Sequence, residues 1–410
     1  MQKIYVCGPT VYNSVHIGNI RPILTFDIII RAGKKIGEQF YFVHNITDID
    51  DKIIKRAIEE KVSETVISSK YADEYIELLK KFNIVSVDKF EYVTDNLDLI
   101  NEYIEKLVDT KNAYLDKYNN VYFDVEKNKN HYGSISNQNI EKMQFEDENN
   151  INNKNNPADF ALWKQTDLGI KYNSKFGKGR PGWHTECCVL IYKHFGSEGV
   201  DIHGGGIELI FPHHENENIQ HHSLFKRDLA KKWIRTGMLK INGEKMSKSL
   251  NNFILASEFL DKYRSDIYRM MILNTQISGD LDFNDETIHN SKVILNKFRK
   301  ILFSYHVNSN QTDGSVQKQI AEEIFNDIYN NNFAIATRKI NELIKNINKQ
   351  NNTNDVLTLI EIFKTLGFDT EIENLDFYKN IYFSWKEKLA QKNYNEADKL
   401  REVLYTNELI

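Results

Sequence analysis

The N-terminal region alternates between short apolar runs and amphipathic stretches, and this alternation limits the possible folds more than any other feature. Residues 3–9 (KIYVCGP) are an apolar run that ends in Gly-Pro, which is typical of a strand followed by a turn. Residues 21–37 have helix-compatible apolar spacing and end in glycine, and residues 39–47 read as a second strand. Residues 48–61 open another helix, with acidic side chains in its first turn. The order strand, helix, strand, helix predicts a parallel α/β core.

The rest of the chain departs from this pattern and predicts further units. From Ala113 the sequence alternates like strands and then becomes rich in asparagine, so we expect an insertion with a polar loop. The core is expected to resume at residues 159–164 (DFALWK), and the chain after Asp282 is helix-like to its end. The predicted units are 1–112, the first half of the core; 113–156, the connective insertion; 157–235, the second half of the core; 236–281, a connecting region; and 282–410, a helical bundle.

The composition argues against two broad classes of protein. Apolar residues make up 41% of the chain, yet no apolar run approaches the roughly 20 residues of a membrane helix, and the N-terminus lacks a secretory pattern. The three cysteines, Cys7, Cys187 and Cys188, cannot form a disulfide framework, so we expect a reducing cytoplasm and no membrane. The formal net charge of −5 argues against a large basic surface but allows a local basic stripe.

Histidines concentrate in residues 212–222 (PHHENENIQHH), where a metal site and a solvated helix face are both open interpretations. Pro212 suits the first position of a helix, and side chains four apart in that helix share a face and can chelate one ion. Three rows have this spacing: His213 with Glu217, Glu217 with His221, and His214 with Asn218 and His222. The zinc-protease pattern H-E-x-x-H is not met, and spacing alone leaves the three rows open.

The cysteines add support for a metal site. Cys7 closes the first predicted strand, at the edge where an α/β sheet presents its ligands, and Cys187 lies in the sequence GWHTECC. Two thiolates, an imidazole and a carboxylate make a four-ligand zinc set. The competing interpretation is that each cysteine is a small buried apolar residue, which is the commoner fate of a lone cysteine.

Two further motifs suit nucleotide phosphates. His16 to Asn19 (HIGN) fall between the first predicted strand and its helix, where histidine can donate to phosphates and Gly18 permits close backbone approach. An ordinary strand–helix turn would also explain these four residues. Residues 243–252 (GEKMSKSLNN) contain Lys245 and Lys248 with hydroxyl groups between and after them, which suits a loop that binds a triphosphate. A solvated basic turn is the alternative for this segment.

HIGN and KMSKS together resemble the signatures of class I aminoacyl-tRNA synthetases. Longer strings resemble the cysteinyl-tRNA synthetases: YVCGPTVYNSVHIGN, NITDIDDKIIKRA, DFALWK, RPGWHTEC, DIHGGGIELIFPHHENE and GEKMSKSLNNF. The resemblance implies an α/β fold with a Rossmann-like parallel sheet, a small insertion and a following α-helical bundle that binds tRNA. It also implies that the chain uses ATP, with magnesium, to activate L-cysteine as cysteinyl-adenylate and transfers it to the 3′ end of tRNA(Cys). A monomer is the default expectation.

The resemblance assigns the metal ligands residue by residue. The zinc-binding positions of the family match Cys7, Cys187, His213 and Glu217. The neighbouring residues that would not be ligands are Cys188, His214, His221 and His222. In the family the zinc holds the thiolate of the substrate cysteine, and zinc lowers the pKa of a thiol whereas a serine hydroxyl stays protonated. Discrimination on the order of 10⁴ from such a contact would make an editing domain unnecessary.

The resemblance also assigns residues around ATP and the amino acid. His16, Gly18 and Asn19 would line the phosphates with Lys245 and Lys248, and Lys248 would stabilise charge at the α-phosphate during the attack by the cysteine carboxylate. The residues expected close to the adenosine are His203, Gly204, Gly205 and Gly206. The residues expected near the amino acid are Cys7, Thr47 and Trp183, although a buried threonine and a core tryptophan are ordinary alternatives.

The sequence departs from the family pattern at two points. The usual fourth signature residue is histidine and here it is Asn19, which can still donate a hydrogen bond to phosphate, so we expect activity. The chain also starts close to YVCG and stops soon after an ADxxR-like helix, so we expect the C-terminal anticodon domain to be absent or reduced.

Two other functions stay open at this point. The cysteine ligase of mycothiol biosynthesis is related and has about this length, and it also uses zinc, ATP and cysteine but passes cysteine to an aminosugar. The lysine-rich helical tail, which includes residues 290–305 (NSKVILNKFRKILFSY), favours tRNA over that acceptor. The other possibility is a zinc-dependent nucleic-acid-binding module without catalysis, and the intact KMSKS sequence argues against it.

Overall fold

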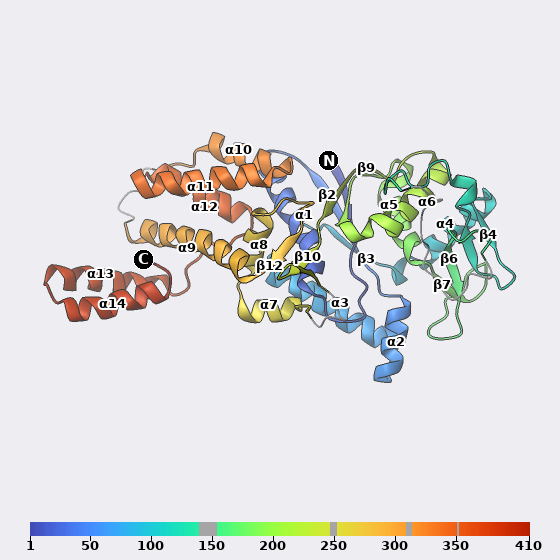
Figure 1. Cartoon of the computed structure of the whole chain (residues 1–410), viewed down its shortest axis with the longest axis horizontal. Helices are drawn as coiled ribbons and strands as arrows, with labels where there is room; N and C mark the ends of the chain where they lie inside the picture. Colours follow the sequence, from blue (N-terminus) through green and yellow to red (C-terminus); the bar gives the residue numbers. More distant parts are fainter. Residues whose placement is uncertain (139–153, 247–251, 309–313, 351) are drawn as a thin grey trace.

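The parallel sheet predicted from the N-terminal alternation is present. The computed structural model describes residues 1–138, 154–246, 252–308, 314–350 and 352–410. Its central sheet has five parallel strands in the order β3-β2-β1-β8-β9 (Figure 1). The strands are β1 (Gln2–Val6), β2 (Phe40–Ile46), β3 (Lys89–Tyr92), β8 (Val200–Gly206) and β9 (Ala230–Thr236). The predicted α/β fold class is therefore confirmed.

Helices connect these strands, and local sequence decides where several of them begin. The helices are α1 (Ile17–Lys35), α2 (Asp51–Glu60), α3 (Glu64–Lys81), α4 (Leu97–Asp109), α5 (Trp183–Phe195) and α6 (Glu215–Phe225). The Asp50 side chain accepts from the backbone N–H of Lys52 at 2.8 Å, and Ser63 caps α3 in the same way. The first strands are added on one side of β1 and the later strands on its other side, so the strand order of the sheet reverses at β1. In such sheets, ligands bind beyond the carboxyl ends of the strands at this point, which here are those of β1 and β8.

The insertion is larger than its predicted bounds. A separate antiparallel sheet contains, in order, β4 (Ala113–Leu115), β5 (Val121–Phe123), β6 (Phe160–Gln165) and β7 (Gly179–Pro181). The sequence prediction placed residues 157–235 in the second half of the core, but β6 pairs with β5 and β7 and not with the parallel sheet. A short buried apolar run has no period that reveals which sheet it joins. The ring of Phe160 stacks on Phe123 of the insertion with ring centroids 5.0 Å apart.

The chain leaves the core through a small sheet and ends in helices. The small sheet consists of β10 (Leu239–Ile241), β11 (Glu244–Lys245) and β12 (Leu281–Phe283), with α7 (Ala256–Lys262) and α8 (Ser265–Leu273) before β12. The bundle consists of α9 (Asp285–Val307), α10 (Lys318–Tyr329), α11 (Phe333–Gln350) and α12 (Thr353–Thr365). The helical hairpin of α13 (Leu375–Ala390) and α14 (Tyr394–Thr406) projects beyond it at one end of the molecule (Figure 1). Among the described residues, no helix combines the length and apolar character that crossing a membrane requires.

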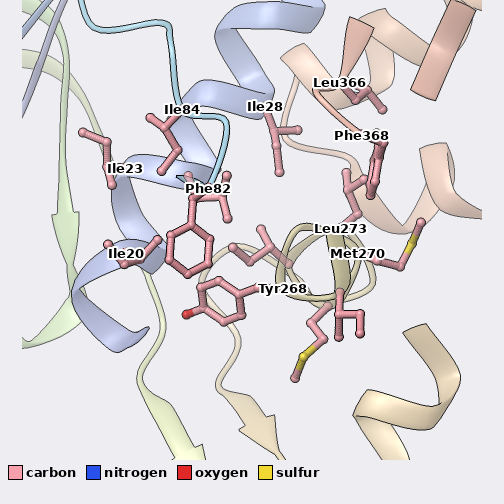
Figure 2. Packing of buried hydrophobic residues seen from close by; sticks show 14 of the residues in the cluster. Ile20, Ile23, Ile28, Phe82, Ile84, Tyr268, Met270, Leu273, Leu366 and Phe368 are labelled. Carbon is pink, nitrogen blue, oxygen red and sulfur yellow. The ribbon is translucent and has the colours of Figure 1, made fainter. Parts of the chain in front are cut away.

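One apolar cluster joins the parallel sheet to the bundle. Tyr268 and Leu273 of α8 are buried in this cluster together with Ile20 of α1 and Phe82, which follows α3 (Figure 2). The rings of Phe82 and Tyr268 meet edge to face with centroids 6.1 Å apart. The Tyr268 hydroxyl donates to the carbonyl oxygen of Ile17 at 2.7 Å, so the buried hydroxyl is satisfied. Helix α8 is therefore one apolar link between the start of α1 and the C-terminal helices, and α1 also packs directly on α10.

A buried ion pair adds a directional contact to this interface. Arg269 of α8 is 1% exposed, and its guanidinium donates to Asp27 Oδ2 of α1 at 3.0 Å. It also donates to the carbonyl oxygens of Phe82 and Leu366 at 2.8 and 2.9 Å. Burial by itself raises the pKa of Asp27, but the guanidinium groups of Arg269 and Arg31 outweigh burial and hold that pKa below its usual range. The pair thus ties α1, α8 and the end of α12 to one another.

Removal of the Arg269 guanidinium should weaken the attachment of the bundle. Arg269→Met keeps an apolar stem but leaves the Asp27 carboxylate buried without its α8 partner, and the loss of one member of a buried pair costs about 3–5 kcal/mol. We therefore expect the apparent free energy of unfolding in guanidinium chloride, followed by circular dichroism, to fall by about 3 kcal/mol. Arg227→Met is the matched control, because Arg227 pairs with Glu198 on the surface and its loss should cost less than about 1 kcal/mol.

The acid response of the same pair provides an independent check. The folded-state pKa of Asp27 lies below its unfolded value of about 3.9, so its stabilising contribution is complete above that pH and is lost as the pH falls through the folded pKa. Asp27→Asn should therefore flatten the loss of stability that the wild-type chain shows below about pH 4. An acid profile that this substitution leaves unchanged would contradict the role assigned to the pair.

Candidate active site

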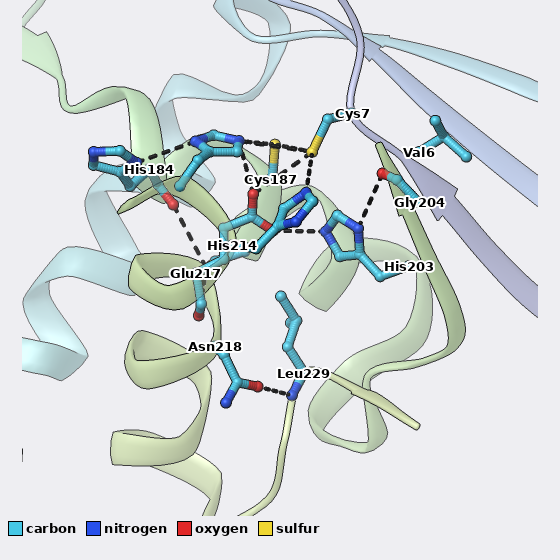
Figure 3. Close-up of polar contacts among 12 residues, drawn as sticks. Val6, Cys7, His184, Cys187, His203, Gly204, His214, Glu217, Asn218 and Leu229 are labelled. Carbon is cyan, nitrogen blue, oxygen red and sulfur yellow. Dashed lines mark hydrogen bonds and ion pairs between the residues drawn. The ribbon is translucent and has the colours of Figure 1, made fainter. Parts of the chain in front are cut away.

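Four side chains from three separate parts of the sequence meet beyond the end of β1. Cys7 follows the last residue of β1, Cys187 lies on α5, and Glu217 lies in the first turn of α6 (Figure 3). His213 lies in a wider turn of residues 210–214 that leads directly into α6. Cys7 Sγ is 3.8 Å from Cys187 Sγ and 3.6 Å from both His213 Nε2 and Glu217 Oε1. His213 Nε2 is 3.7 Å from Cys187 Sγ and 2.7 Å from Glu217 Oε1.

These distances fit one tetrahedral zinc ion. Zinc–sulfur bonds of about 2.3 Å place two sulfur ligands about 3.8 Å apart around such an ion. Cys7 Sγ and Cys187 Sγ lie at this separation, 3.8 Å. The distance between His213 and Glu217 is shorter than a ligand–ligand edge because the two groups form an ion pair with each other. Two thiols, an imidazole and a carboxylate are also the donor types that zinc prefers.

Burial and mutual contact set the protonation of this cluster. Burial raises the pKa of Cys7, and its neighbours Cys187 and Glu217 raise it further. Burial also acts to raise the pKa of Cys187, but hydrogen bonds with Cys7 and His213 outweigh it and lower that pKa. For His213, burial lowers the pKa, but Glu217 and Cys187 outweigh burial and raise the pKa to about 10. Uptake of a metal ion would therefore release protons from Cys7 and His213.

Two residues at the start of α5 orient the His213 ring. His184 Nδ1 lies 3.1 Å from His213 Nδ1, so a His213 ring that has lost one proton to become neutral would keep the other on Nδ1 and turn the Nε2 lone pair toward the sulfurs. Burial lowers the pKa of His184, so its ring is neutral and can accept the hydrogen bond from His213 Nδ1. Trp183 stacks on His213 with ring centroids 4.1 Å apart. Sequence reasoning did not single out His184, although its place in GWHTEC beside Cys187 was the available signal.

Two more histidines contact the cluster from its other side. His203 Nε2 is 2.6 Å from Glu217 Oε2, and His214 Nε2 is 3.8 Å from Cys7 Sγ, so these residues form a second group with ligand spacing (Figure 3). Arg235 Nε can only donate and lies 3.2 Å from His214 Nδ1, so the ring proton of His214 is on Nε2. The Glu217 carboxylate can only accept a hydrogen bond, so the His203 nitrogen that points at it, Nε2, carries a proton. Both rings therefore act as hydrogen-bond donors, which favours His213 as the imidazole ligand.

The last histidines of residues 212–222 lie away from the thiols. His221 Nε2 donates to the carbonyl oxygen of Ser197 at 3.2 Å, and burial lowers the pKa of His221 to about 4. The ring of His222 stacks on that of His131 with centroids 3.5 Å apart. Three rows of side chains in this helix had four-residue spacing. His213 with Glu217 is the row in which both side chains lie 3.6 Å from Cys7 Sγ.

A cavity of about 380 Å³ opens beside Cys7 and extends to the start of α1. The predicted site residues that line it are Cys7, His16, Gly18, Asn19, Trp183 and Gly206. Lys52, Glu208 and Met246 also line it, and sequence reasoning did not assign them a role. A second hollow of about 460 Å³ lies between α9 and α13, and its lining has no cysteine, histidine or acidic residue among the residues that the structure describes there.

Some of the residues expected near the amino acid or the adenosine are not part of the cavity lining. They are Thr47, His203, Gly204 and Gly205. Thr47 is 1% exposed and donates to Glu186 Oε2 at 2.9 Å. A Cβ atom on Gly204 would lie 2.3 Å from the Phe26 ring, so glycine is needed there for the packing of α1 on β8. Gly205 is buried in the same strand.

The start of α1 explains part of the HIGN sequence. The backbone N–H of His16 donates to Asn19 Oδ1 at 3.2 Å, so Asn19 caps the helix. A Cβ atom on Gly18 would lie 2.9 Å from the His16 ring, so a larger residue would crowd this turn. Lys245 ends β11 and is exposed. Lys248 belongs to residues 247–251, which lie outside the described residues.

The chain is similar to known proteins of one family. Residues 1–293 match the family described as tRNA synthetases class I (C) catalytic domain. The cysteine–tRNA ligase of Mesomycoplasma hyopneumoniae is 42% identical over 403 residues, which cover 98% of this chain and 96% of the relative. That of Malacoplasma penetrans is 40% identical over 434 residues, which cover 100% of this chain and 95% of the relative.

A solved structure shares the fold at low sequence identity. Methionyl-tRNA synthetase of Mycobacterium tuberculosis, in complex with methionyl-adenylate, superposes with a TM-score of 0.65 and 15% identity, over 89% of this chain and 90% of that chain. The likeness covers most of the chain, so it supports the fold and no finer property. With the family match and the two relatives, it shows that the chain belongs to the cysteine–tRNA ligases, a family of class I tRNA synthetases.

Proposed function

We propose that this chain uses ATP to activate L-cysteine as cysteinyl-adenylate and then transfers the cysteinyl group to the 3′-terminal adenosine of tRNA(Cys). Its family membership supports this reaction. The observation that carries the proposal is that Cys7 of the thiol cluster and His16 of the HIGN sequence line one cavity. An amino acid held at the cluster and a nucleotide held at the start of α1 would then react within that cavity.

Activation requires positioning and charge stabilisation more than covalent catalysis. The cysteine carboxylate attacks the α-phosphorus of ATP, and pyrophosphate leaves with magnesium. His16, Asn19 and the backbone at Gly18 would hold the phosphates at the N-terminus of α1, where a helix favours anions. Lys245 and Lys248 would supply positive charge, with Lys248 at the α-phosphate. A network of donors in a partly enclosed cavity stabilises this charge better than water does.

The adenosine would lie along the end of β8. Gly206 lines the cavity, so its backbone can approach the nucleotide without a side chain in between. Gly204 and Gly205 would support this position through the packing of β8. His203 would act from behind the cavity, because its Nε2 is held by the Glu217 carboxylate at 2.6 Å.

We also propose one zinc ion per chain, held by Cys7, Cys187, His213 and Glu217. When bound there, the ion would supply a Lewis acid that favours a substrate thiolate over a serine hydroxyl. The residues around it would hold the ligands in place: His184 and Trp183 hold the His213 ring, and His203 donates to the outer oxygen of Glu217. Trp183 lines the cavity and would also contact the amino acid, with Thr47 behind it.

The proposed setting is a monomer in a reducing cytoplasm. Cys7, Cys187 and Cys188 are all free thiols, and oxidation of the first two would remove two of the proposed zinc ligands. A compartment that keeps thiols reduced is therefore consistent with the proposed site.

Substitution of Cys7 tests the zinc assignment. Cys7→Ser removes one of the two soft ligands, so zinc retained after gel filtration, measured by atomic emission, should fall well below one ion per chain. Cys188→Ser is the matched control: Cys188 Sγ donates to the backbone carbonyl of Glu217 at 3.0 Å, and a serine hydroxyl can make the same bond. Zinc that stays as tightly bound in Cys7→Ser as in the wild-type chain would contradict the assignment.

Substitution of Lys248 separates activation from metal binding. Lys248→Ala should lower the rate of cysteine-dependent exchange between ATP and pyrophosphate by about 100-fold or more, because loss of one charge-stabilising donor typically costs that much. Bound zinc should not change. Lys262→Ala removes an exposed lysine at the end of α7 and should leave the exchange rate as it is. Loss of zinc from Lys248→Ala would show that the role given to this lysine is wrong.

The acceptor of the cysteine decides between the proposed reaction and its closest alternative. We expect radiolabelled cysteine to become acid-precipitable only when tRNA(Cys) is present, and an aminosugar should not accept it. The names of the relatives and the helical region after residue 282 favour tRNA over the aminosugar. Transfer to an aminosugar without tRNA would overturn the proposal, and a lack of any cysteine-dependent exchange would point to a binding module without catalysis.

A further inference from the structure

A second group of metal-ligating side chains lies at the far end of α6. It consists of His131 from the insertion, His222 from the last turn of α6, and Asp228 from the turn before β9. His131 Nε2 is 2.7 Å from Asp228 Oδ1. The rings of His131 and His222 are nearly parallel, with centroids 3.5 Å apart and 11° between their planes. One ligand atom from each of the three residues lies within 4.8 Å of the other two.

This group is separate from the thiol cluster. The two groups share no residue, and Glu217 and His222 are five positions apart on α6, about 7.5 Å along a helix axis. The second group is also open to solvent, because the side chains of His131 and Asp228 are 29% and 52% exposed. An ion there could enter directly and complete its coordination with water.

Asp228 and His222 have capacity for an ion, and His131 can bind through Nε2 once the ion displaces the proton that this nitrogen donates to Asp228. Because imidazole lone pairs lie in the ring plane, the stacked His222 ring must turn about its Cβ–Cγ bond to share that ion with His131. Asp228 Oδ1 accepts from His131 and from Asn218 Nδ2 at 3.1 Å, and a carboxylate has lone pairs beyond these two bonds. Nδ1 of His222 is buried and has no hydrogen-bond partner in the part of the chain that the structure describes. Burial, followed by the proximity of His131, lowers the pKa of His222, so its ring is in the neutral form that binds metals.

We propose that His131, His222 and Asp228 bind a divalent transition-metal ion such as zinc. Two imidazoles and one carboxylate suit zinc, nickel or copper, whereas calcium and magnesium prefer a shell made of oxygen atoms alone. With three protein ligands, the remaining coordination positions are taken by water. The site therefore binds more weakly and exchanges faster than the enclosed thiol cluster.

An ion at this position connects the insertion, through His131, to the last turn of α6, through His222. The segment that follows His131 already docks on the first turn of α6: the Tyr132 hydroxyl donates to Asn216 Oδ1 at 2.6 Å, and Glu215 Oε2 accepts from the backbone of Ser136 at 2.8 Å. An ion at the last turn of α6 adds a contact at the opposite end of the helix. The insertion then holds both ends of the helix that carries Glu217.

The test is a count of metal ions per chain in the apo-protein after titration with Co²⁺ or Zn²⁺. We expect two ions per wild-type chain and one in Asp228→Asn or His222→Ala. Asp228→Asn replaces an exposed carboxylate by a group of the same shape, so circular dichroism should show an intact fold. His289→Ala, which removes an exposed histidine on α9, is the matched control and should keep two ions.

Cobalt spectra distinguish this inference from the proposed zinc site. Cobalt bound at the thiol cluster gives an intense thiolate-to-metal absorption in the near ultraviolet, whereas cobalt at two imidazoles and a carboxylate gives weak visible bands alone. Cys7→Ser should remove the first signal and keep the second, and Asp228→Asn should do the reverse. A wild-type chain that takes up one ion in excess metal, or a second ion that persists in both Asp228→Asn and His222→Ala, would overturn the inference.

Discussion

The site depends on the burial of one carboxylate. Glu217 is completely buried, and a buried charge is costly unless charged or hydrogen-bonded partners surround it. Burial alone would raise the pKa of Glu217, but His203 and His213 outweigh it and keep that pKa well below its usual range. These partners come from β8 and from the turn before α6, and Cys7 at the end of β1 completes the shell. The carboxylate thus requires β1, β8 and the turn before α6 to meet at the edge of the sheet.

Helix α1 also carries buried charged side chains, and their partners lie in other parts of the molecule. Its first turn faces the cavity, and its buried charges hold other units in place. The guanidinium of Arg21 donates to the carbonyl oxygens of Gly237 and Gly279, both at 2.6 Å, which attaches the small sheet. Asp27 pairs with Arg269 and attaches the bundle. The cavity at the start of α1, the connecting region and the C-terminal helices are therefore held by one rigid element.

Local patterns in the sequence predicted the parallel sheet, the helical C-terminal region and the pairing of His213 with Glu217 on one face. They misplaced residues 160–181, because a buried apolar run such as β6 does not reveal its partner strands. The family resemblance, and not a local pattern, assigned His203 to the surroundings of the adenosine; in the structure His203 Nε2 lies 2.6 Å from Glu217 Oε2. The group of His131, His222 and Asp228 had no signal, because His131 lies far in the sequence from the other two residues.

The sequence by itself determined the α/β alternation, the helix starts, and the residue types of the proposed zinc and nucleotide sites, because these depend on spacing within a few residues. It also carried the resemblance that selected Cys7, Cys187, His213 and Glu217. The tertiary structure decided which imidazole can offer a lone pair. Arg235 places the proton of His214 on Nε2, and His184 leaves Nε2 of His213 toward the sulfurs. Such choices depend on hydrogen bonds between residues far apart in the chain, which no local pattern encodes.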